Sequence, residues 1–361
     1  MLSFSLLIVA FCAYLFILSA LSLGKKEKQF FIILGAIFFM LLVSLRPNIF
    51  PDTQSYRDIF NKVDISKHYG FNPIKKEIET SVEYGFVWLI WIIKKFAGIS
   101  ADGFLIIIAF MELLCYVGFV NKFSKKDIDS ITNTSVMLFP YFGMLWFFVT
   151  IRVGLAMLIA LNAFFYASTN KAKSALYKVF WYAIAFSFHR IVIIVAGLEL
   201  LYRFIKIRSK KYYFVVFCIS VLLIALGKYI TMLTGKVLNI VSNKFDFLSY
   251  SDYLRNTDFA NYKAPLRVIY FVLMSGVPIL YYDRIKENSE KTVGIASISS
   301  IVTALTSGIN GASRIYDCFN VFIVIILSKL TLGNEKNRVL DVCVRMYCIL
   351  GLGIIYRLLI L

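Results

Sequence analysis

The sequence predicts an all-α protein that crosses a membrane about twelve times. Of its 361 residues, 60% are hydrophobic and 17% are aromatic, and the mean hydropathy is +0.76. Apolar runs of roughly 20 residues, the length that spans a bilayer as a helix, recur from one end of the chain to the other. A water-soluble protein of this composition would expose large apolar patches. We therefore expect one integral membrane domain over residues 1–361, without an internal repeat.

Two long apolar runs decide the number of spans. The run from Ile131 to Ser168 is nearly twice the length needed to cross, so we expect a hairpin that turns at Arg152. The run over 172–206 is expected to turn in the same way at His189 and Arg190. The twelve expected spans are 2–23, 29–46, 103–121, 131–149, 153–168, 172–188, 190–206, 212–231, 265–283, 292–309, 312–331 and 339–360.

The charge distribution gives these spans a sidedness. In the twelve-span arrangement the short loops on one side each carry several lysines or arginines, whereas the turns on the other side carry one arginine each. This asymmetry places the lysine-rich side in the cytoplasm and both termini outside. The formal charge of +18 is then a property of membrane topology and does not indicate a nucleic-acid partner. The single arginines of the outer turns are Arg152, Arg190 and Arg314.

The segment from Ser81 to Ala97 does not fit a span. Its apolar core of about ten residues is short, and a crossing here would invert every later loop. We expect it to lie in the outer interface, where Trp88 and Trp91 are favourable, with a thirteenth span as the alternative. Two long outer loops then follow, at about 47–102 and 232–264. The second contains the polar and aromatic stretch 250–256, which either covers an outer cavity or serves as a connector.

Metal and cofactor patterns do not appear in the sequence. The six cysteines lie inside apolar runs without paired spacing, and only two histidines occur, His68 and His189. No glycine-rich phosphate loop is present. We therefore expect no metal, no bound cofactor and no disulfide, and a donor substrate that is already activated. The first apolar segment is too long for a signal-peptide core and is expected to stay as a span.

Ionisable residues at the expected outer face are the candidates for chemistry, because charges near a membrane core are costly and often functional. Arg152 has apolar neighbours on both sides and suits an anion such as phosphate, although a turn arginine that reaches toward water is the alternative. Arg314 has the same standing, and Asp317, three residues later, could be its ion-pair partner. His189 is a candidate base or phosphate ligand, or else a residue that satisfies backbone groups at its turn.

Glu83 and Asp52 are the alternative bases, since a carboxylate beside apolar walls binds a proton more readily. Asp52 also follows a proline and could be the N-cap of a helix over 53–60. Asp52, Tyr56 and Phe60 recur every four residues, so a helix here places them on one face.

In order along the chain, four short motifs resemble the EpsG/Wzy group of membrane polysaccharide polymerases. A late Arg314-x-Tyr316 is a weaker fifth. Phe148 or Val149 and Val153 stand where the group usually has asparagine and glutamine, and Arg190 stands where a small residue is common. The acceptor sugar therefore cannot be taken from relatives. The four motifs are Asp52-x-x-x-Tyr56-x-x-x-Phe60, Glu83-x-Gly85-Phe86, Ile151-Arg152-x-Gly154-Leu155-Ala156 and Phe188-His189.

The resemblance implies a metal-independent glycosyltransferase with a GT-C-like helical fold in the bacterial cytoplasmic membrane. It would transfer a growing O-antigen or other surface polysaccharide chain from undecaprenyl diphosphate to a new lipid-linked repeat unit on the outer face. The lipid-linked oligosaccharide, the bilayer and a chain-length regulator are the implied partners.

The same resemblance suggests roles for the candidate residues. The diphosphate would be bound by Arg152 and Arg314 with help from Arg46 or Arg190, and the base would be His189 or Glu83. Asp52 would order the outer helix or a sugar. The two motif tyrosines, which complete the substrate-binding set, are Tyr56 and Tyr316.

Two other functions are compatible with a multispan protein. A flippase for the same lipid-linked unit should carry charges deep inside its spans and two related halves, neither of which is obvious here. A membrane acyltransferase that modifies surface sugars would need a partner for His189, and none lies near it in sequence.

Overall fold

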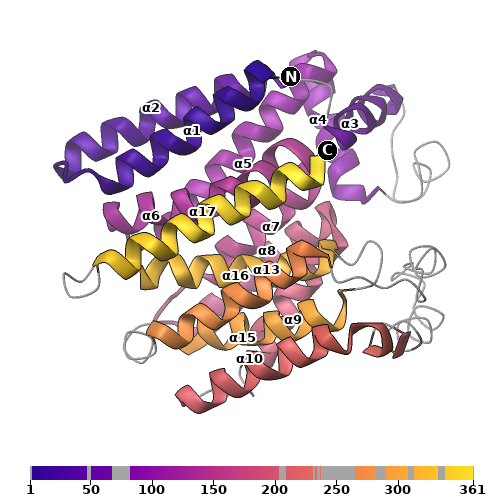
Figure 1. Ribbon diagram of the computed structural model, residues 1–361. Helices are drawn as coiled ribbons and strands as arrows, with labels where there is room; N and C mark the ends of the chain where they lie inside the picture. The colour runs from indigo at the N-terminus through magenta and orange to yellow at the C-terminus, as the bar shows by residue number, and fades with distance from the viewer. Residues whose placement is uncertain are drawn as a thin grey trace. The chain divides into compact units, whose positions relative to one another are not determined.

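The computed structural model describes residues 2–46, 50–66, 82–202, 209–230, 265–281, 290–307, 313–331 and 338–360, together with 232, 233 and 236. All regular structure within these ranges is helical (Figure 1). The chain forms two compact units, one of residues 1–196 with 356–361 and the other of residues 197–355. The prediction of an all-α protein is confirmed.

The first unit contains the helices up to the start of α9. Their bounds are α1 (Leu2–Ala20), α2 (Lys25–Ser44), α3 (Pro51–Lys62), α4 (Tyr84–Ala97), α5 (Ala101–Phe123), α6 (Ile128–Leu138), the π-helices η2 (Phe139–Gly143) and η3 (Leu145–Val149), α7 (Ile151–Phe164), α8 (Lys171–Phe188), the 3₁₀ turn η4 (Arg190–Val192) and α9 (Ile193–Tyr202). The second unit contains α10 (Lys210–Ala225), α13 (Leu266–Gly276), the 3₁₀ turn η6 (Val277–Tyr281), α15 (Glu290–Leu305), α16 (Ser313–Leu330) and most of α17 (Arg338–Ile360).

Each of the twelve expected spans coincides with one helix or with consecutive helical segments. Among the described residues, α2 and α5 are long and apolar enough to cross a membrane by length and composition, and several shorter apolar helices accompany them. That all twelve segments cross remains a prediction. Within segment 81–97 the structure has α4 over Tyr84–Ala97, a helix of 14 residues, and the place of the segment at the membrane interface also remains a prediction. Nearly all of the loop expected at 232–264, including its stretch 250–256, lies outside the described residues.

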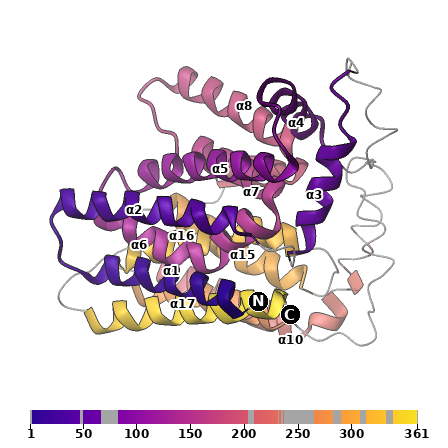
Figure 2. The same ribbon diagram turned by 90° about the horizontal axis from the view of Figure 1, so that it is seen from above.

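Helix α7 is the core of the first unit. Almost every residue from Ile151 to Phe164 is buried, because α7 packs between α5 and α8. Figure 2 shows α5 and α7 side by side, with α2 on one side of them and α8 on the other. A packed group of phenylalanine rings fills the space between α1, α2 and the π-helices, with Phe39 4.8 Å from Phe147 and 5.0 Å from Phe139 between ring centroids.

The chain breaks its helix at Thr150, inside the first unit. Thr150 has φ −107° and ψ 58°, and its N–H donates to the Leu145 carbonyl at 2.7 Å to close the last π turn. A new helix begins at Ile151, where the Gly154 N–H donates to the Thr150 carbonyl at 2.7 Å. The helix is therefore interrupted two residues before Arg152, which is the second residue of α7, and the hairpin expected to turn at Arg152 remains a prediction. The expected turn at His189 is confirmed, because α8 ends at Phe188.

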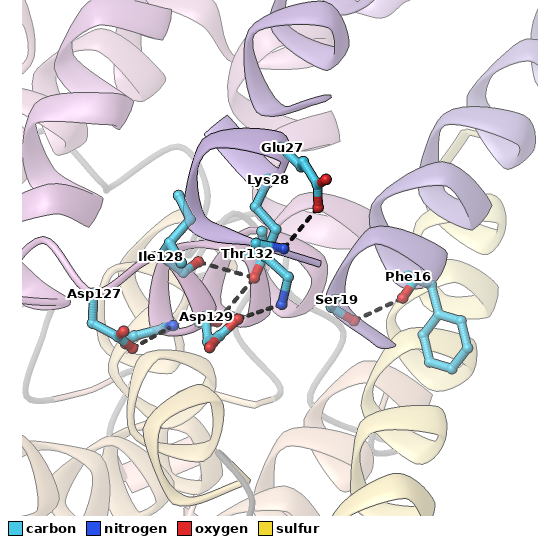
Figure 3. Close-up of polar contacts among 10 residues, drawn as sticks. Phe16, Ser19, Glu27, Lys28, Asp127, Ile128, Asp129 and Thr132 are labelled. Carbon is cyan, nitrogen blue, oxygen red and sulfur yellow. Dashed lines mark hydrogen bonds and ion pairs between the residues drawn. The ribbon is translucent and has the colours of Figure 1, made fainter. Parts of the chain in front are cut away.

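The lysine-rich helix ends of the first unit are joined by polar contacts at the end opposite this break. Lys28 is only 5% exposed and forms an ion pair with Asp129 at the start of α6, as Figure 3 shows. Lys122, near the end of α5, donates to the Asn162 side chain of α7 at 2.9 Å and to the Tyr177 hydroxyl of α8 at 3.2 Å. These contacts join α2 to α6 and join α5 to α7 and α8, and the sidedness expected from the loop charges remains a prediction.

In the second unit, α15 packs on α10 and α16 through buried hydroxyl groups. Ser220 and Ser300 share a hydrogen bond of 2.9 Å, and Ser299 and Thr303 donate to the side-chain Oδ1 of Asn320 at 3.0 and 2.9 Å. Small polar residues let helices approach closely and hydrogen-bond where apolar surroundings give little other specificity.

Candidate functional site

Gly85 allows the start of α4 to pack closely against the end of α8. A Cβ at Gly85 would lie 2.2 Å from the Ser187 hydroxyl oxygen and 2.7 Å from the Ser187 carbonyl oxygen. Only glycine permits this approach without a shift of the backbone. Glu83, the N-cap residue of α4, is brought next to the turn that follows α8.

The Glu83 carboxylate is the centre of a cluster of cationic groups. Its Oε2 lies 3.0 Å from Nη1 of Arg152, and its Oε1 accepts the backbone N–H of Arg190 at 3.2 Å and lies 3.6 Å from the Arg190 Nε. The Glu83 and Arg152 side chains are only 11% and 13% exposed, so the pair interacts with little screening by water. Glu83, at the start of α4, thereby contacts both the first turn of α7, through Arg152, and the turn after α8, through Arg190. We call Glu83, Arg152, His189 and Arg190 the Glu83 cluster.

His189 completes the cluster and has a defined donor and acceptor pattern. Its Nδ1 accepts the backbone N–H of Ile191 at 3.2 Å and lies 3.9 Å from the Glu83 Oε1. Because Nδ1 is an acceptor, a neutral His189 carries its proton on Nε2. The alternative that His189 satisfies backbone groups at its turn is therefore correct, and it leaves Nε2 as a hydrogen-bond donor.

Helix α3 lies against the cluster through Tyr56. The Tyr56 hydroxyl accepts the backbone N–H of Arg152 at 3.4 Å, and its ring lies 5.9 Å from that of Phe86 on α4. Phe60, one turn later, packs on Phe104 of α5 at 5.2 Å. The predicted helix and the shared face of Tyr56 and Phe60 are confirmed.

Asp52 differs from its expected local role. The N-cap of α3 is Phe50 and Pro51 is the first helical residue, so the prediction of Asp52 as N-cap is wrong. Asp52 lies in the first turn, where its negative charge is favourable beside the positive end of the helix dipole. The helix starts two residues earlier than expected because proline suits the first helical position.

Arg46 lies beyond the end of α2 and is 8% exposed, with its guanidinium carbon 5.6 Å from the centroid of the Phe148 ring. The sequence did not single out Glu112 of α5, which is fully buried. A Cβ at Gly154 would lie 2.7 Å from the Glu112 Oε1, so the glycine of the Ile-Arg-x-Gly motif makes room for this carboxylate. A glutamate in the middle of an apolar run was the available signal.

The second unit holds a separate polar cluster. Arg267 of α13 donates to the Tyr316 hydroxyl, and its Nη1 lies 3.8 Å from the Asp317 Oδ2. Asp317 thus pairs with Arg267 in the first turn of α13, and Arg314 is exposed at the start of α16. The pair suggested for Asp317 with Arg314 stays a prediction. We call Arg267, Tyr316 and Asp317 the Arg267 cluster.

Within the described part of the chain, no group of three or more His, Cys, Asp or Glu side chains is placed to hold a metal ion. The six cysteines are free thiols. The polar sites of both units are built from arginine, carboxylate, tyrosine and histidine side chains.

A family model matches nearly the whole chain. The EpsG family model covers residues 28–360. The chain belongs to the EpsG family. No curated protein and no solved structure matches it. Together with the apolar helices, membership of the EpsG family identifies a helical membrane protein of the polysaccharide-polymerase type. The Glu83, Arg152 and His189 motifs all fall within the matched residues.

Proposed function

We propose that this EpsG-family protein is a surface polysaccharide polymerase. It transfers the growing chain from undecaprenyl diphosphate to a sugar hydroxyl of a new lipid-linked repeat unit at the outer face of the bacterial cytoplasmic membrane. O-antigen is the polysaccharide that we favour. The observation that carries the proposal is the Glu83 cluster, where two arginines from separate helix starts surround one carboxylate in a poorly hydrated site.

The charge of the cluster suits a departing diphosphate. Arg152 and Arg190 bring two guanidinium groups to the Glu83 carboxylate, and guanidinium groups are suited to bind an anion. A guanidinium fork matches phosphate oxygens in geometry and stays protonated. We assign Arg152 as the principal diphosphate ligand, assisted by Arg190 and Arg46. Arg314 and Tyr316 belong to the second unit, and their contact with substrate is part of the proposal.

The hydrogen-bonding groups of His189 and Glu83 suggest different roles for the two residues. A neutral His189 whose Nδ1 accepts the Ile191 N–H carries its proton on Nε2, and we assign this N–H to donate to a diphosphate oxygen. Glu83 is the group with oxygen lone pairs at the cluster, so we assign Glu83 as the base. The acceptor hydroxyl oxygen attacks the anomeric carbon, its proton passes to Glu83, and the bond from the anomeric carbon to the diphosphate oxygen breaks. The electron pair leaves with the diphosphate, where Arg152, Arg190 and His189 stabilise it.

Deletion of the gene separates this function from its alternatives. A polymerase mutant should leave a single capped repeat on a polysaccharide gel. A flippase mutant should leave no surface repeat, and an acyltransferase mutant should keep full-length chains. A full-length ladder in the deletion strain would contradict the proposal.

A further inference from the structure

A cavity of about 370 Å³ lies within the first unit, between α1, α2, α5 and α6. Most of its lining side chains are aliphatic or aromatic. The hydroxyl groups of Thr132 and Ser135, which also line it, donate to backbone carbonyls of α6 at 3.0 and 2.9 Å. Ligand sites in proteins have volumes of this order and mainly apolar walls. The cavity therefore suits an apolar ligand.

The length of the cavity matches half of a bilayer. Its lining residues on α2 run from Gln29, near the start of the helix, to Phe39. This interval rises about 15 Å along an α-helix, which is half of the roughly 30 Å hydrocarbon core of a bilayer. The inner end is formed by the Phe39 ring with those of Phe139 and Phe147, at 5.0 and 4.8 Å between centroids. A hydrocarbon chain that belongs to one leaflet fits this length.

The other end of the cavity is polar and lies at the lysine-rich helix ends. Gln29 lines it near the start of α2, and Asn121 lines it near the end of α5. Lys25 and Lys26 lie one turn before Gln29 on the same side of α2, and both are exposed. A ligand whose chain fills the cavity would place its headgroup beside these lysines.

The turn after α5 brings further lysines to this end. The Lys126 N–H donates to the carbonyl of Asn121 at 3.1 Å, which joins the turn to the cavity wall. Lys125 has φ 50° and Lys126 has φ 64°, a region of backbone conformation that glycine adopts with less strain. The backbone conformation therefore does not explain why lysines occupy these positions. Both side chains are exposed to the surroundings of the cavity mouth.

The carboxylates of the same turns are engaged within the protein. Glu27 and Asp127 each accept a backbone N–H at a helix start, at 2.8 and 2.9 Å. Asp129 pairs with the buried Lys28 next to Thr132 of the cavity wall, as Figure 3 shows. The exposed lysines are thus placed to meet an anion from outside the protein.

We propose that this cavity binds an acyl chain of an anionic phospholipid from the leaflet at the lysine-rich side. The phosphate of the lipid lies among Lys25, Lys26, Lys125 and Lys126. Lysine clusters at a membrane surface attract anionic headgroups, and a chain confined to one leaflet fills the apolar length of the cavity. The site is separate from the Glu83 cluster and does not depend on the proposed reaction.

The test titrates the full-length protein, in a mild detergent, with two lipids that have the same chains. Dioleoyl phosphatidylglycerol is anionic, and dioleoyl phosphatidylcholine has no net charge. Native mass spectrometry measures how much of each lipid the protein retains. The wild type should retain one phosphatidylglycerol about tenfold more tightly than phosphatidylcholine. Equal affinity for the two lipids, or no retained lipid, would overturn the proposal.

One variant tests the place of the chain. Ala36→Trp puts a large ring into the cavity and should abolish retention of both lipids. Ile37→Trp changes the next residue of α2, which is 55% exposed, and is the matched control that should bind like the wild type. If a folded Ala36→Trp protein retains phosphatidylglycerol as the wild type does, the chain does not occupy this cavity.

A second variant tests the headgroup and leaves the cavity packing intact. Lys125→Gly/Lys126→Gly should fold normally, because glycine adopts the positive φ angles of this turn. Its preference for phosphatidylglycerol over phosphatidylcholine should fall several-fold. An unchanged preference would overturn the role of these lysines, and this comparison holds even if Ala36→Trp does not fold.

An isoprenoid is the competing occupant. Farnesyl diphosphate, which combines an isoprenoid chain with a charged end, should leave the retained phosphatidylglycerol in place. Displacement of phosphatidylglycerol from the wild type would overturn the assignment of a phospholipid and identify the cavity as an isoprenoid site.

Discussion

The polar clusters of the two units differ in how their buried charges are compensated. In the first unit one carboxylate, Glu83, is surrounded by two arginines and a histidine from two helix starts. In the second unit one arginine, Arg267, is shared between a tyrosine and an aspartate. The first arrangement brings two guanidinium groups to one carboxylate, whereas the second pairs one guanidinium with one carboxylate. The comparison teaches that separate helix starts can gather several guanidinium groups at one place, as an anion site requires, whereas a one-to-one pair fits a structural role.

The largest effect is expected for Arg152→Ala. This change removes the guanidinium that lies 3.0 Å from Glu83 and leaves a buried carboxylate with less compensation. The proposed diphosphate ligand is lost from the transition state, so chain extension should fall more than about hundredfold and a single-repeat band should replace the ladder on a gel. Arg57→Ala, which removes an exposed pair with Asp102, is the control and should keep the ladder. A normal ladder with Arg152→Ala at normal expression would remove Arg152 from the mechanism.

His189→Asn should separate the structural role of His189 from its catalytic role. The asparagine carbonyl oxygen can still accept the Ile191 N–H, which His189 now accepts at 3.2 Å, so the midpoint of thermal unfolding should stay close to that of the wild type. The Nε2 donor is lost, and chain extension should fall about hundredfold. His189→Ala should lower both stability and activity. If His189→Asn extends chains normally, the Glu83 cluster does not use the Nε2 proton.

A smaller effect is expected for Gly85→Ala. The added methyl group would meet the backbone oxygen of Ser187 at 2.7 Å and push α4 from α8. Overpacking of this kind costs about 1–3 kcal/mol, so both thermal stability and activity should fall. Gly197→Ala is the matched control, because a Cβ at Gly197 meets no atom within 4 Å. Gly98→Ala is unsuitable because Gly98 has φ +58°, where an alanine is strained. Equal stability of the Gly85 and Gly197 variants would show that α4 can move without cost.

The smallest net effect is expected when both charges of the Arg267 cluster are replaced. Arg267→Met alone leaves Asp317 without the partner at 3.8 Å and should destabilise the protein by about 3–5 kcal/mol. The double variant Arg267→Met/Asp317→Leu should recover most of that stability, because buried pairs replaced by apolar residues are often nearly neutral. Heating followed by size-exclusion chromatography measures this. A double variant that is stable but forms single repeats would instead make the Arg267 cluster part of the substrate site.

Much of the molecule was determined by the sequence alone. Apolar run lengths predicted most of the described helical segments, because hydrophobic length is a local property of the chain. The interruptions near Arg152 and at His189 followed from runs that are too long for one span. Local rules were less reliable for Asp52, since proline rather than aspartate decides where α3 begins.

Only the tertiary structure decided which charges meet. Glu83 and Arg190 are 107 residues apart, and no spacing rule connects them; the close approach of Gly85 to Ser187 does. The sequence did not show that Glu112 of α5 lies next to Gly154 of α7; the packing of the two helices places it there. Electrostatic partners depend on distance in space and on the exclusion of water, and packing between helices sets both.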